Sequence, residues 1–488
     1  MWKLTTRRPG RVACRAASGY NVTVPAFDSL SATDAQFIYG DSDRAPMSMG
    51  NLCLFEGEPL FDEKGVFRLD DVRRAIESRL HLVPRYRRKL LEVPGGFAHP
   101  IMVDDPNFDI VQHVKLVALP KPGSDEQLKE AYARAHEGML NHARPLWEIT
   151  FIEGLEDGRV GMVQKIHHGP FDGASTVDIM DQLFDGTAEH VETEAPPWSP
   201  EPAPDPVTLM NVRWAEQVSS AWNWAQEQER LAKDDPDRAE EVSAAMKALE
   251  EVKKAPKTSL NVPIGPRRRY DWVPTTLAVA KEIRGLVAGC TVNDVMLTVV
   301  AGGLRELLKS RGEDVDDLVL QVMVPVSLRS TSGVSDAGNQ VSAFVAPLPV
   351  CEADAVERLE SIHRSTTELK EGKQALGIQL VTQSTQYTPA SLMAAAGRTS
   401  NEQSSGINLT VTNVPGPRRE LFLLGARMLE LNPQVLIGND ITLNVAVESY
   451  VDKLSIGLCS DAEANPDLHV LRDAIARELD ELLARARK

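Results

Sequence analysis

The sequence is short of several features that would assign it to other classes of protein. It has only five cysteines in 488 residues, without any Cys-x-x-Cys pair, so neither a disulfide framework nor a cysteine zinc site is indicated and a reducing compartment is expected. No uninterrupted apolar run reaches the length of a membrane span. The net charge of −17 argues against a general nucleic-acid binder. These absences predict a cytoplasmic globular protein without a nucleic-acid partner.

Two common catalytic signatures are absent too. The sequence contains no Gly-x-Ser-x-Gly elbow, so a serine nucleophile is not indicated. It also lacks a His-Glu-x-x-His pair, which many zinc hydrolases carry. Any chemistry must therefore come from another pattern.

The most informative stretch is residues 167–173, which read His-His-Gly-Pro-Phe-Asp-Gly. The mostly apolar residues 159–166 come just before it and follow an Asp-Gly turn signal, so they predict a strand of a buried sheet. Because side chains alternate along a strand, His167 and His168 are expected on opposite faces. By this parity His168 shares its face with largely apolar residues.

A neutral imidazole on such a face is a good acceptor for a hydroxyl proton, so His168 is the candidate general base. Asp172 is expected either to orient the imidazole or to hold the turn by pairing with a buried arginine, and the pattern does not choose between them. Gly173 permits the tight turn, after which residues 174–180 predict a helix. No third convincing ligand accompanies the string, so we expect neither a metal nor another cofactor.

The string resembles the catalytic motif of the coenzyme A-dependent acyltransferase superfamily. Within that superfamily, the rest of the chain is similar to the bacterial wax ester synthase/acyl-CoA:diacylglycerol acyltransferase family. Each short block of similarity is weak alone, whereas the ordered set is specific and spans nearly the whole chain. The blocks fall at residues 29–37, 83–88, 105–110, 144–148, 292–295, 325–329, 338–340, 413–417 and 449–457.

The resemblance implies an α/β fold of two chloramphenicol-acetyltransferase-like domains with mixed sheets and a tunnel between them. We expect a disordered or basic tail (1–27), an N-terminal domain (28–190), a proline-rich linker with connecting helices (191–257) and a C-terminal domain (258–488). The pattern of the second half agrees with this fold class. It predicts helices at 292–308 and 468–484 and strands at 318–326, 341–350, 407–412 and 441–447.

Two segments lie outside the expected domains. Residues 1–19 hold five basic residues and no acid; we prefer a disordered tail or an upstream start codon over a transit peptide or a basic membrane anchor. Residues 207–254 predict exposed helices that carry Trp214, Trp222 and Trp224. These tryptophans could dock onto a lipid surface or a partner, or, as we prefer, pack against the protein's own domains.

By the same resemblance, the chain is expected to move a long-chain acyl group from acyl-CoA to diacylglycerol or a fatty alcohol, without an acyl-enzyme. His168 would act as the base, and His167, Asp172 and Gly173 would complete the motif. Peripheral contact with a membrane or lipid droplet is also implied. Two alternatives stay open: another acceptor, glycolipid or carrier-bound, and a catalytically silent lipid-binding protein.

Further candidates follow from the other blocks. Asn293 would either cap its helix or position the thioester oxyanion, and the pattern does not choose. Residues 169–171 depart from the small or aliphatic residues usual in the family, which puts the acceptor in doubt more than the fold. Arginines 85, 87, 88 and 267–269 could meet coenzyme A phosphates, although solvated charge is our preferred interpretation. The residues expected to line the substrate tunnel are Pro170, Phe171, Asn413, Pro415 and Gly416.

Overall fold

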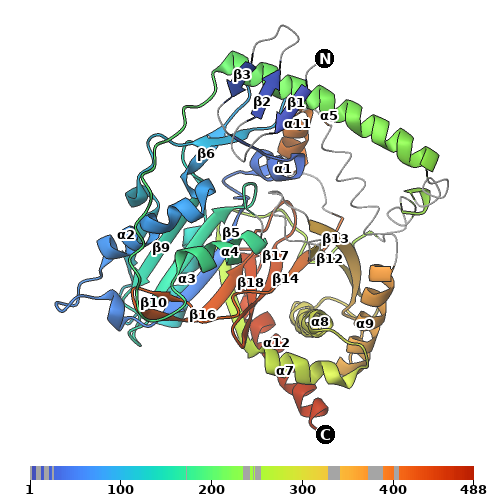
Figure 1. Cartoon of the computed structure of the whole chain (residues 1–488). Coiled ribbons are helices and arrows are strands. Elements are labelled where there is room, and N and C mark those ends of the chain that lie inside the picture. The colour runs from blue at the N-terminus through green and yellow to red at the C-terminus, as the bar shows by residue number, and fades with distance from the viewer. Residues whose placement is uncertain are drawn as a thin grey trace.

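The computed structural model shows two layered α/β halves (Figure 1). Its described residues form two six-stranded mixed sheets and two three-stranded sheets, together with helices that cover the large sheets. The mixed α/β class expected from the sequence is therefore confirmed. The structure describes residues 3–6, 12–15, 21–24, 27–171, 173–234, 242–245, 247, 254–327, 341–371, 388, 390–400 and 406–488.

The first large sheet has the strand order β15-β16-β5-β10-β9-β8. Only the β8–β9 pair is parallel, whereas the other neighbours are antiparallel. Every residue of β10 is buried, which explains why its sequence is almost continuously apolar. The strands are β5 (Ser48–Phe55), β8 (Val114–Ala118), β9 (Trp147–Glu153), β10 (Val160–His167), β15 (Phe422–Leu423) and β16 (Ala426–Gln434).

The second large sheet has the order β11-β18-β17-β14-β12-β13, with β14 parallel to both β12 and β17. Helix α8 lies buried against it and forms the centre of the largest apolar core. The strands and helices predicted for the second half are confirmed to within a few residues. The strands are β11 (Arg268–Thr276), β12 (Val319–Ser327), β13 (Val341–Pro349), β14 (Leu409–Val414), β17 (Leu443–Tyr450) and β18 (Lys453–Asp461).

Helices cover both large sheets, and their bounds fit the sequence patterns. The helix predicted after the His-His string is α4, and the predicted closing helix is α12. The helices are α1 (Ala32–Gly40), α2 (Leu69–Arg79), α3 (Asp125–His136), α4 (Gly173–Leu183), α5 (Pro206–Asp234), α7 (Leu277–Ile283), α8 (Val292–Ser310), α9 (Ala355–Glu371), α11 (Ala390–Ser400) and α12 (Leu468–Ala486).

The chain crosses the expected boundary between the domains. Strands β15 and β16 come from the last quarter of the sequence, yet β16 pairs with β5 and completes the first sheet, with Leu431 opposite Cys53. The boundary drawn at residue 258 assigned both strands to the C-terminal domain. Such a long-range pairing leaves no local signal in the sequence, because either strand would look the same with another partner.

The two smaller sheets lie at the N-terminal side. Strands β4 (Asp28–Ser29), β7 (Ile101–Asp104) and β6 (Arg88–Leu91) form one of them. Strands β1 (Lys3–Thr6), β2 (Val12–Arg15) and β3 (Asn21–Val24) form an antiparallel sheet within residues 1–27, the segment for which we predicted a disordered or basic tail. The rest of that segment lies outside the described residues.

Helix α5 exposes apolar side chains to solvent. Its inward face buries Leu209 and Val212, so at 100° per residue Trp214 and Trp222 fall on the outer side. They are 56% and 65% exposed. Trp214 still meets the ring of Phe97 edge-on at 5.8 Å, so the prediction that these tryptophans pack against the protein's own domains holds in part for Trp214 and is wrong for Trp222. In the part of the chain that the structure describes, no helix has the length and apolar character needed to span a membrane.

Candidate active site

The His-His pair lies where β10 ends. The imidazole of His168 stacks on the ring of Phe37 from α1, with 4.0 Å between ring centroids and 18° between planes. The backbone N–H of His168 donates to the carbonyl of Met47 at 2.8 Å. His168 is only partly buried. Its imidazole is therefore still accessible from solvent, while Met47 holds its backbone and Phe37 supports its ring.

His167 has different surroundings, as the strand alternation predicts. It is 1% exposed, and burial lowers its pKa although the nearby carboxylate of Asp41 opposes that shift. Its Nδ1 accepts a hydrogen bond from the N–H of Gly169 at 3.0 Å, so the proton of the neutral ring must sit on Nε2. His167 is thus a neutral ring that carries its proton on Nε2.

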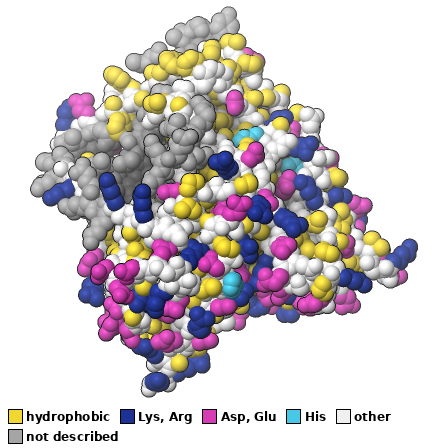
Figure 2. All heavy atoms as spheres, turned by 180° about the vertical axis from the view of Figure 1, so that it is seen from behind, with side chains coloured by type: hydrophobic (Ala, Val, Ile, Leu, Met, Phe, Trp, Pro, Cys, Tyr) yellow, Lys and Arg dark blue, Asp and Glu magenta, His cyan; other side chains and the backbone are white. Residues whose placement is uncertain are grey.

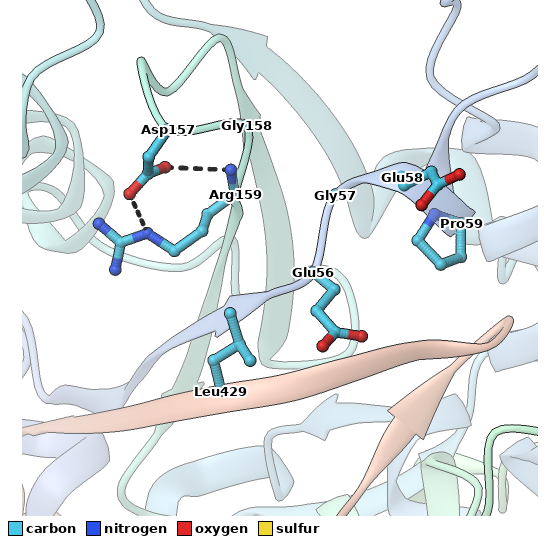
Figure 3. Close-up of a pocket in the computed structure, with 8 residues that line it drawn as sticks. All are labelled: Glu56, Gly57, Glu58, Pro59, Asp157, Gly158, Arg159 and Leu429. Atoms are coloured by element: carbon cyan, nitrogen blue, oxygen red, sulfur yellow. Dashed lines mark hydrogen bonds and ion pairs between the residues drawn. The ribbon is translucent and has the colours of Figure 1, made fainter.

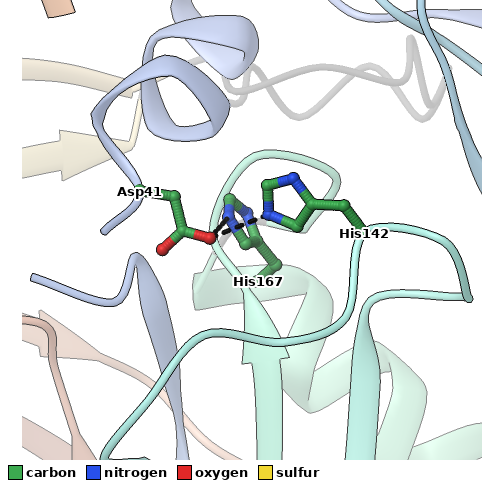
Figure 4. Close-up of side chains that lie close together, drawn as sticks. All are labelled: Asp41, His142 and His167. Carbon is green, nitrogen blue, oxygen red and sulfur yellow. Dashed lines mark hydrogen bonds and ion pairs between the residues drawn. The ribbon is translucent and has the colours of Figure 1, made fainter. Parts of the chain in front are cut away.

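Asp41 and His142 complete a cluster with His167 that the sequence did not predict (Figure 4). Asp41 Oδ2 lies 2.8 Å from His142 Nε2 and 3.3 Å from His167 Nε2. Burial disfavours the charged carboxylate, but its hydrogen bonds from both histidines and from the backbone of Met47 outweigh this and hold the pKa of Asp41 well below its usual value. No spacing in the sequence connects these three residues; only the fold brings them together.

The turn after the histidines packs closely on α1. A Cβ atom on Gly169 would lie 2.9 Å from the carbonyl oxygen of Asp34 and 3.0 Å from Ile38, so only glycine fits here without movement. The carbonyl of Pro170 accepts a hydrogen bond from Arg85 at 2.7 Å.

The ring of Phe171 packs into the N-terminal core. Phe171 is 3% exposed and meets Tyr86 edge-on at 5.5 Å. The contacts described for Pro170 and Phe171 are therefore with the protein itself, and their role in substrate binding stays a prediction. Asp172 lies outside the described residues, and Gly173 begins α4.

The second half brings two of its candidates together. The amide of Asn413 Nδ2 donates to Asn293 Oδ1 at 3.5 Å. Thr291 caps α8, and its side chain and that of Asp294 form a reciprocal capping box, so the capping role considered for Asn293 is wrong. The contact of Asn293 with Asn413 does not test whether Asn293 positions the thioester oxyanion, so that role stays a prediction.

The loop after Asn413 is fixed against β17. The N–H of Gly416 donates to Ser449 Oγ at 3.1 Å, and a Cβ at this glycine would lie 1.9 Å from the carbonyl oxygen of Ser449. Pro415 is exposed. The rigid loop expected from this turn-rich segment is thus present, while its contact with substrate stays a prediction.

The candidate arginines are mostly engaged with the protein. Arg85 and Arg88 pair with Asp28 at 3.3 and 2.7 Å, and the guanidinium of Arg87 lies 4.9 Å from the ring centroid of Trp198. Our preferred interpretation as solvated charge is wrong for these three. The interpretation as solvated charge holds for Arg267 and Arg269, whose side chains are exposed, whereas Arg268 is buried.

A polar depression of about 430 Å³ lies at the other end of β10 (Figure 3). Residues 56–59, residues 157–159 and Leu429 line it. Arg159 directly precedes β10, so at 3.3 Å per residue this depression is about 25 Å from the histidines. We therefore do not assign it to the site of the His-His motif.

Comparison with known proteins agrees with this arrangement. The fold resembles that of a wax ester synthase/diacylglycerol acyltransferase from Marinobacter aquaeolei VT8, with a TM-score of 0.65 and 24% identity over 94% of this chain and 100% of that chain. It also resembles the first condensation domain of the calcium-dependent antibiotic synthetase, with a TM-score of 0.59 and 13% identity over 94% of this chain and 97% of that one. Both likenesses show the same two-domain mixed α/β fold.

The sequence comparison gives the family. The model of the wax ester synthase/diacylglycerol acyltransferase catalytic domain matches residues 30–296, and that of the WS/DGAT C-terminal domain matches residues 337–483. A probable diacylglycerol O-acyltransferase of Mycobacterium tuberculosis, tgs1, is 31% identical over 92% of this chain and 95% of its own length. A putative one, Rv3087, is 28% identical over 94% and 97%. The chain belongs to the wax ester synthase/diacylglycerol acyltransferase family, an acyltransferase family.

Proposed function

We propose that this acyltransferase moves a long-chain acyl group from acyl-CoA to the hydroxyl of diacylglycerol or a fatty alcohol, with His168 as general base. The observation that carries the proposal is the fixed placement of His168 at the end of β10, against Phe37 and Met47. Its relatives, named as a diacylglycerol O-acyltransferase and a wax ester synthase/diacylglycerol acyltransferase, supply the acceptor class.

The proposed reaction is a direct transfer. His168 takes the hydroxyl proton, the resulting alkoxide attacks the thioester carbonyl, and the tetrahedral intermediate collapses to ester and coenzyme A thiolate. The protonated imidazole then returns the proton to the thiolate, so the enzyme ends unchanged. We propose that acyl-CoA is a substrate and that no cofactor or metal takes part.

The test is release of coenzyme A from palmitoyl-CoA by the purified protein, with dioleoylglycerol, hexadecanol or no acceptor. We expect acceptor-dependent release, the matching triacylglycerol or wax ester as product, and no loss after treatment with EDTA. Activity only with an acylated carrier protein or a glycolipid acceptor would favour another member of the superfamily. Lipid binding without turnover by any of these substrates would instead favour the silent lipid-binding protein.

We also propose that α5 brings the protein to a lipid surface, because the lipid acceptors are found there. Val207, Trp214, Val218 and Trp222 are each more than half exposed and recur every four or seven residues, so they form one outer stripe. Tryptophan suits the boundary between water and lipid, since its ring is amphipathic. Figure 1 shows α5 along the upper edge of the molecule, away from the two large sheets.

Replacing Trp214 and Trp222 together with serine is expected to weaken binding to vesicles of phosphatidylcholine with dioleoylglycerol by at least about tenfold. Sedimentation with the vesicles measures this. Val66→Ser is the matched control, since Val66 is 59% exposed elsewhere on the molecule. Equal vesicle binding by the double variant and the wild type would contradict the role of α5.

A further inference from the structure

Two contacts fix the backbone at His168, one on each side of its α-carbon. Its own N–H donates to the carbonyl of Met47 at 2.8 Å, and the next N–H, of Gly169, donates to Nδ1 of His167 at 3.0 Å. A proton acceptor must be placed within a fraction of an ångström of its reacting group. These two contacts therefore decide where the imidazole of His168 points.

Both contacts lead back to one carboxylate. Asp41 Oδ1 accepts a hydrogen bond from the N–H of Met47 at 2.7 Å. This bond holds Met47 in place, and the carbonyl of Met47 in turn accepts the N–H of His168. Asp41 Oδ2 lies 3.3 Å from Nε2 of His167, the atom that must carry the proton while Nδ1 serves Gly169. The geometry of this second contact falls short of a hydrogen bond, so it consists mainly of the attraction between the carboxylate charge and the dipole of the Nε2–H group.

We propose that Asp41 is a positioning residue for the acyl transfer: its two oxygens hold the two contacts that fix the backbone at His168. The proposal rests on the proposed function only for the identity of the reaction. Asp41 also ends α1, the helix whose Phe37 stacks on the His168 ring. One side chain thus anchors the backbone of the base and the end of the helix that supports its ring.

The chemistry requires a carboxylate at this place. Both oxygens of Asp41 face N–H donors, and its side chain is 1% exposed. An asparagine would turn an NH₂ group either toward the N–H of Met47 or toward the two histidines, so at least one contact must be lost whichever way the amide points. A change of tautomer at His167 would not repair this, because a proton on Nδ1 would then face the N–H of Gly169.

A metal ion is a weaker interpretation of the same cluster. Asp41, His142 and His167 offer three ligand atoms within 4.8 Å of one another. To bind a metal through Nε2, His167 would have to shed the Nε2 proton while Nδ1 still accepts from Gly169. Such a ring would be an anion, which burial disfavours.

The test compares Asp41→Asn with Asp43→Asn, an exposed acid of the same loop. We expect Asp41→Asn to lower kcat by about 10- to 100-fold with KM for palmitoyl-CoA changed less than about threefold, and Asp43→Asn to match the wild type. Nitrogen-15 NMR of histidine-labelled protein should show His167 protonated on Nε2 in the wild type and altered in Asp41→Asn. Wild-type kcat in Asp41→Asn, or a chelator that abolishes wild-type activity, would overturn the proposal.

A second pair of variants tests the link through His167. In His167→Asn the amide oxygen can still accept the N–H of Gly169, whereas His167→Leu has a similar size and no acceptor. We expect the asparagine variant to keep several-fold more activity, and equal activities in the two variants would overturn the proposal. If the wild type transfers no acyl group, the proposed function fails, and the NMR comparison still decides whether Asp41 fixes the tautomer of His167.

Discussion

Replacing His168 with alanine is expected to lower acceptor-dependent coenzyme A release by about 10²- to 10⁴-fold, the usual contribution of a general base. The physical reason is that the acceptor hydroxyl must lose its proton as it attacks, and alanine offers no acceptor. KM for palmitoyl-CoA should change little, because the imidazole acts mainly in the transition state. Initial rates with dioleoylglycerol over a range of palmitoyl-CoA concentrations measure both parameters.

The control for this variant is His469→Ala, which removes an exposed histidine on α12. His168→Gln is a second variant, because its longer side chain keeps more of the contact with Phe37 and protects the fold. Circular dichroism should show both His168 variants folded. Turnover by a folded His168→Ala protein at the wild-type rate would remove His168 from the role of base.

Replacing Glu448 with glutamine is expected to remove a large pH dependence of stability. Glu448 lies on β17, is 4% exposed, and its Oε1 has no hydrogen-bond partner. The amide of Asn51, in the orientation that satisfies both its polar atoms, donates to Oε2 at 2.9 Å. Burial raises the pKa of Glu448 to about 8, so the side chain is a neutral acid at pH 7.

The direction of the effect follows from proton binding. The unfolded chain has a pKa of about 4.3 for glutamate, so between this value and about 8 folding takes up a proton and stability falls as pH rises. The stabilising contribution of the raised pKa is complete below about pH 4 and lost above about pH 8. From pH 6 to 8 the fall amounts to roughly 2 kcal/mol, because the slope of about 1.4 kcal/mol per unit lessens as pH nears the folded pKa.

Unfolding midpoints in urea at pH 6 and 8.5 measure this effect. The stability of Glu448→Gln relative to the wild type should be greater at pH 8.5 than at pH 6. That of Glu63→Gln, a change at an exposed position, should not depend on pH in this way. A difference between Glu448→Gln and wild type that stays constant with pH would contradict a protonated Glu448. Acidic and basic side chains are mixed over the lower face in Figure 2, and the Glu63→Gln variant controls for the general charge of the protein.

Most of the local structure could be predicted from the sequence. The apolar run before His167 gave β10, the amphipathic periods gave α8 and α12, and the ordered blocks gave the family. The prediction for Trp222, on the outer side of α5, was wrong for a specific reason. Periodicity shows that a helix has apolar faces, but with apolar residues on two sides it cannot tell which side is buried.

The sequence by itself determined the motif, the fold class and the position of His168 at the end of a buried strand, because each of these depends on residues close together in the chain. Only the tertiary structure decided the rest. It brought Asp41 to both His142 and His167, placed Phe37 on His168, and inserted β16 beside β5. These contacts join residues that are about a hundred or more positions apart, and such pairings depend on how the elements pack, which no local pattern encodes.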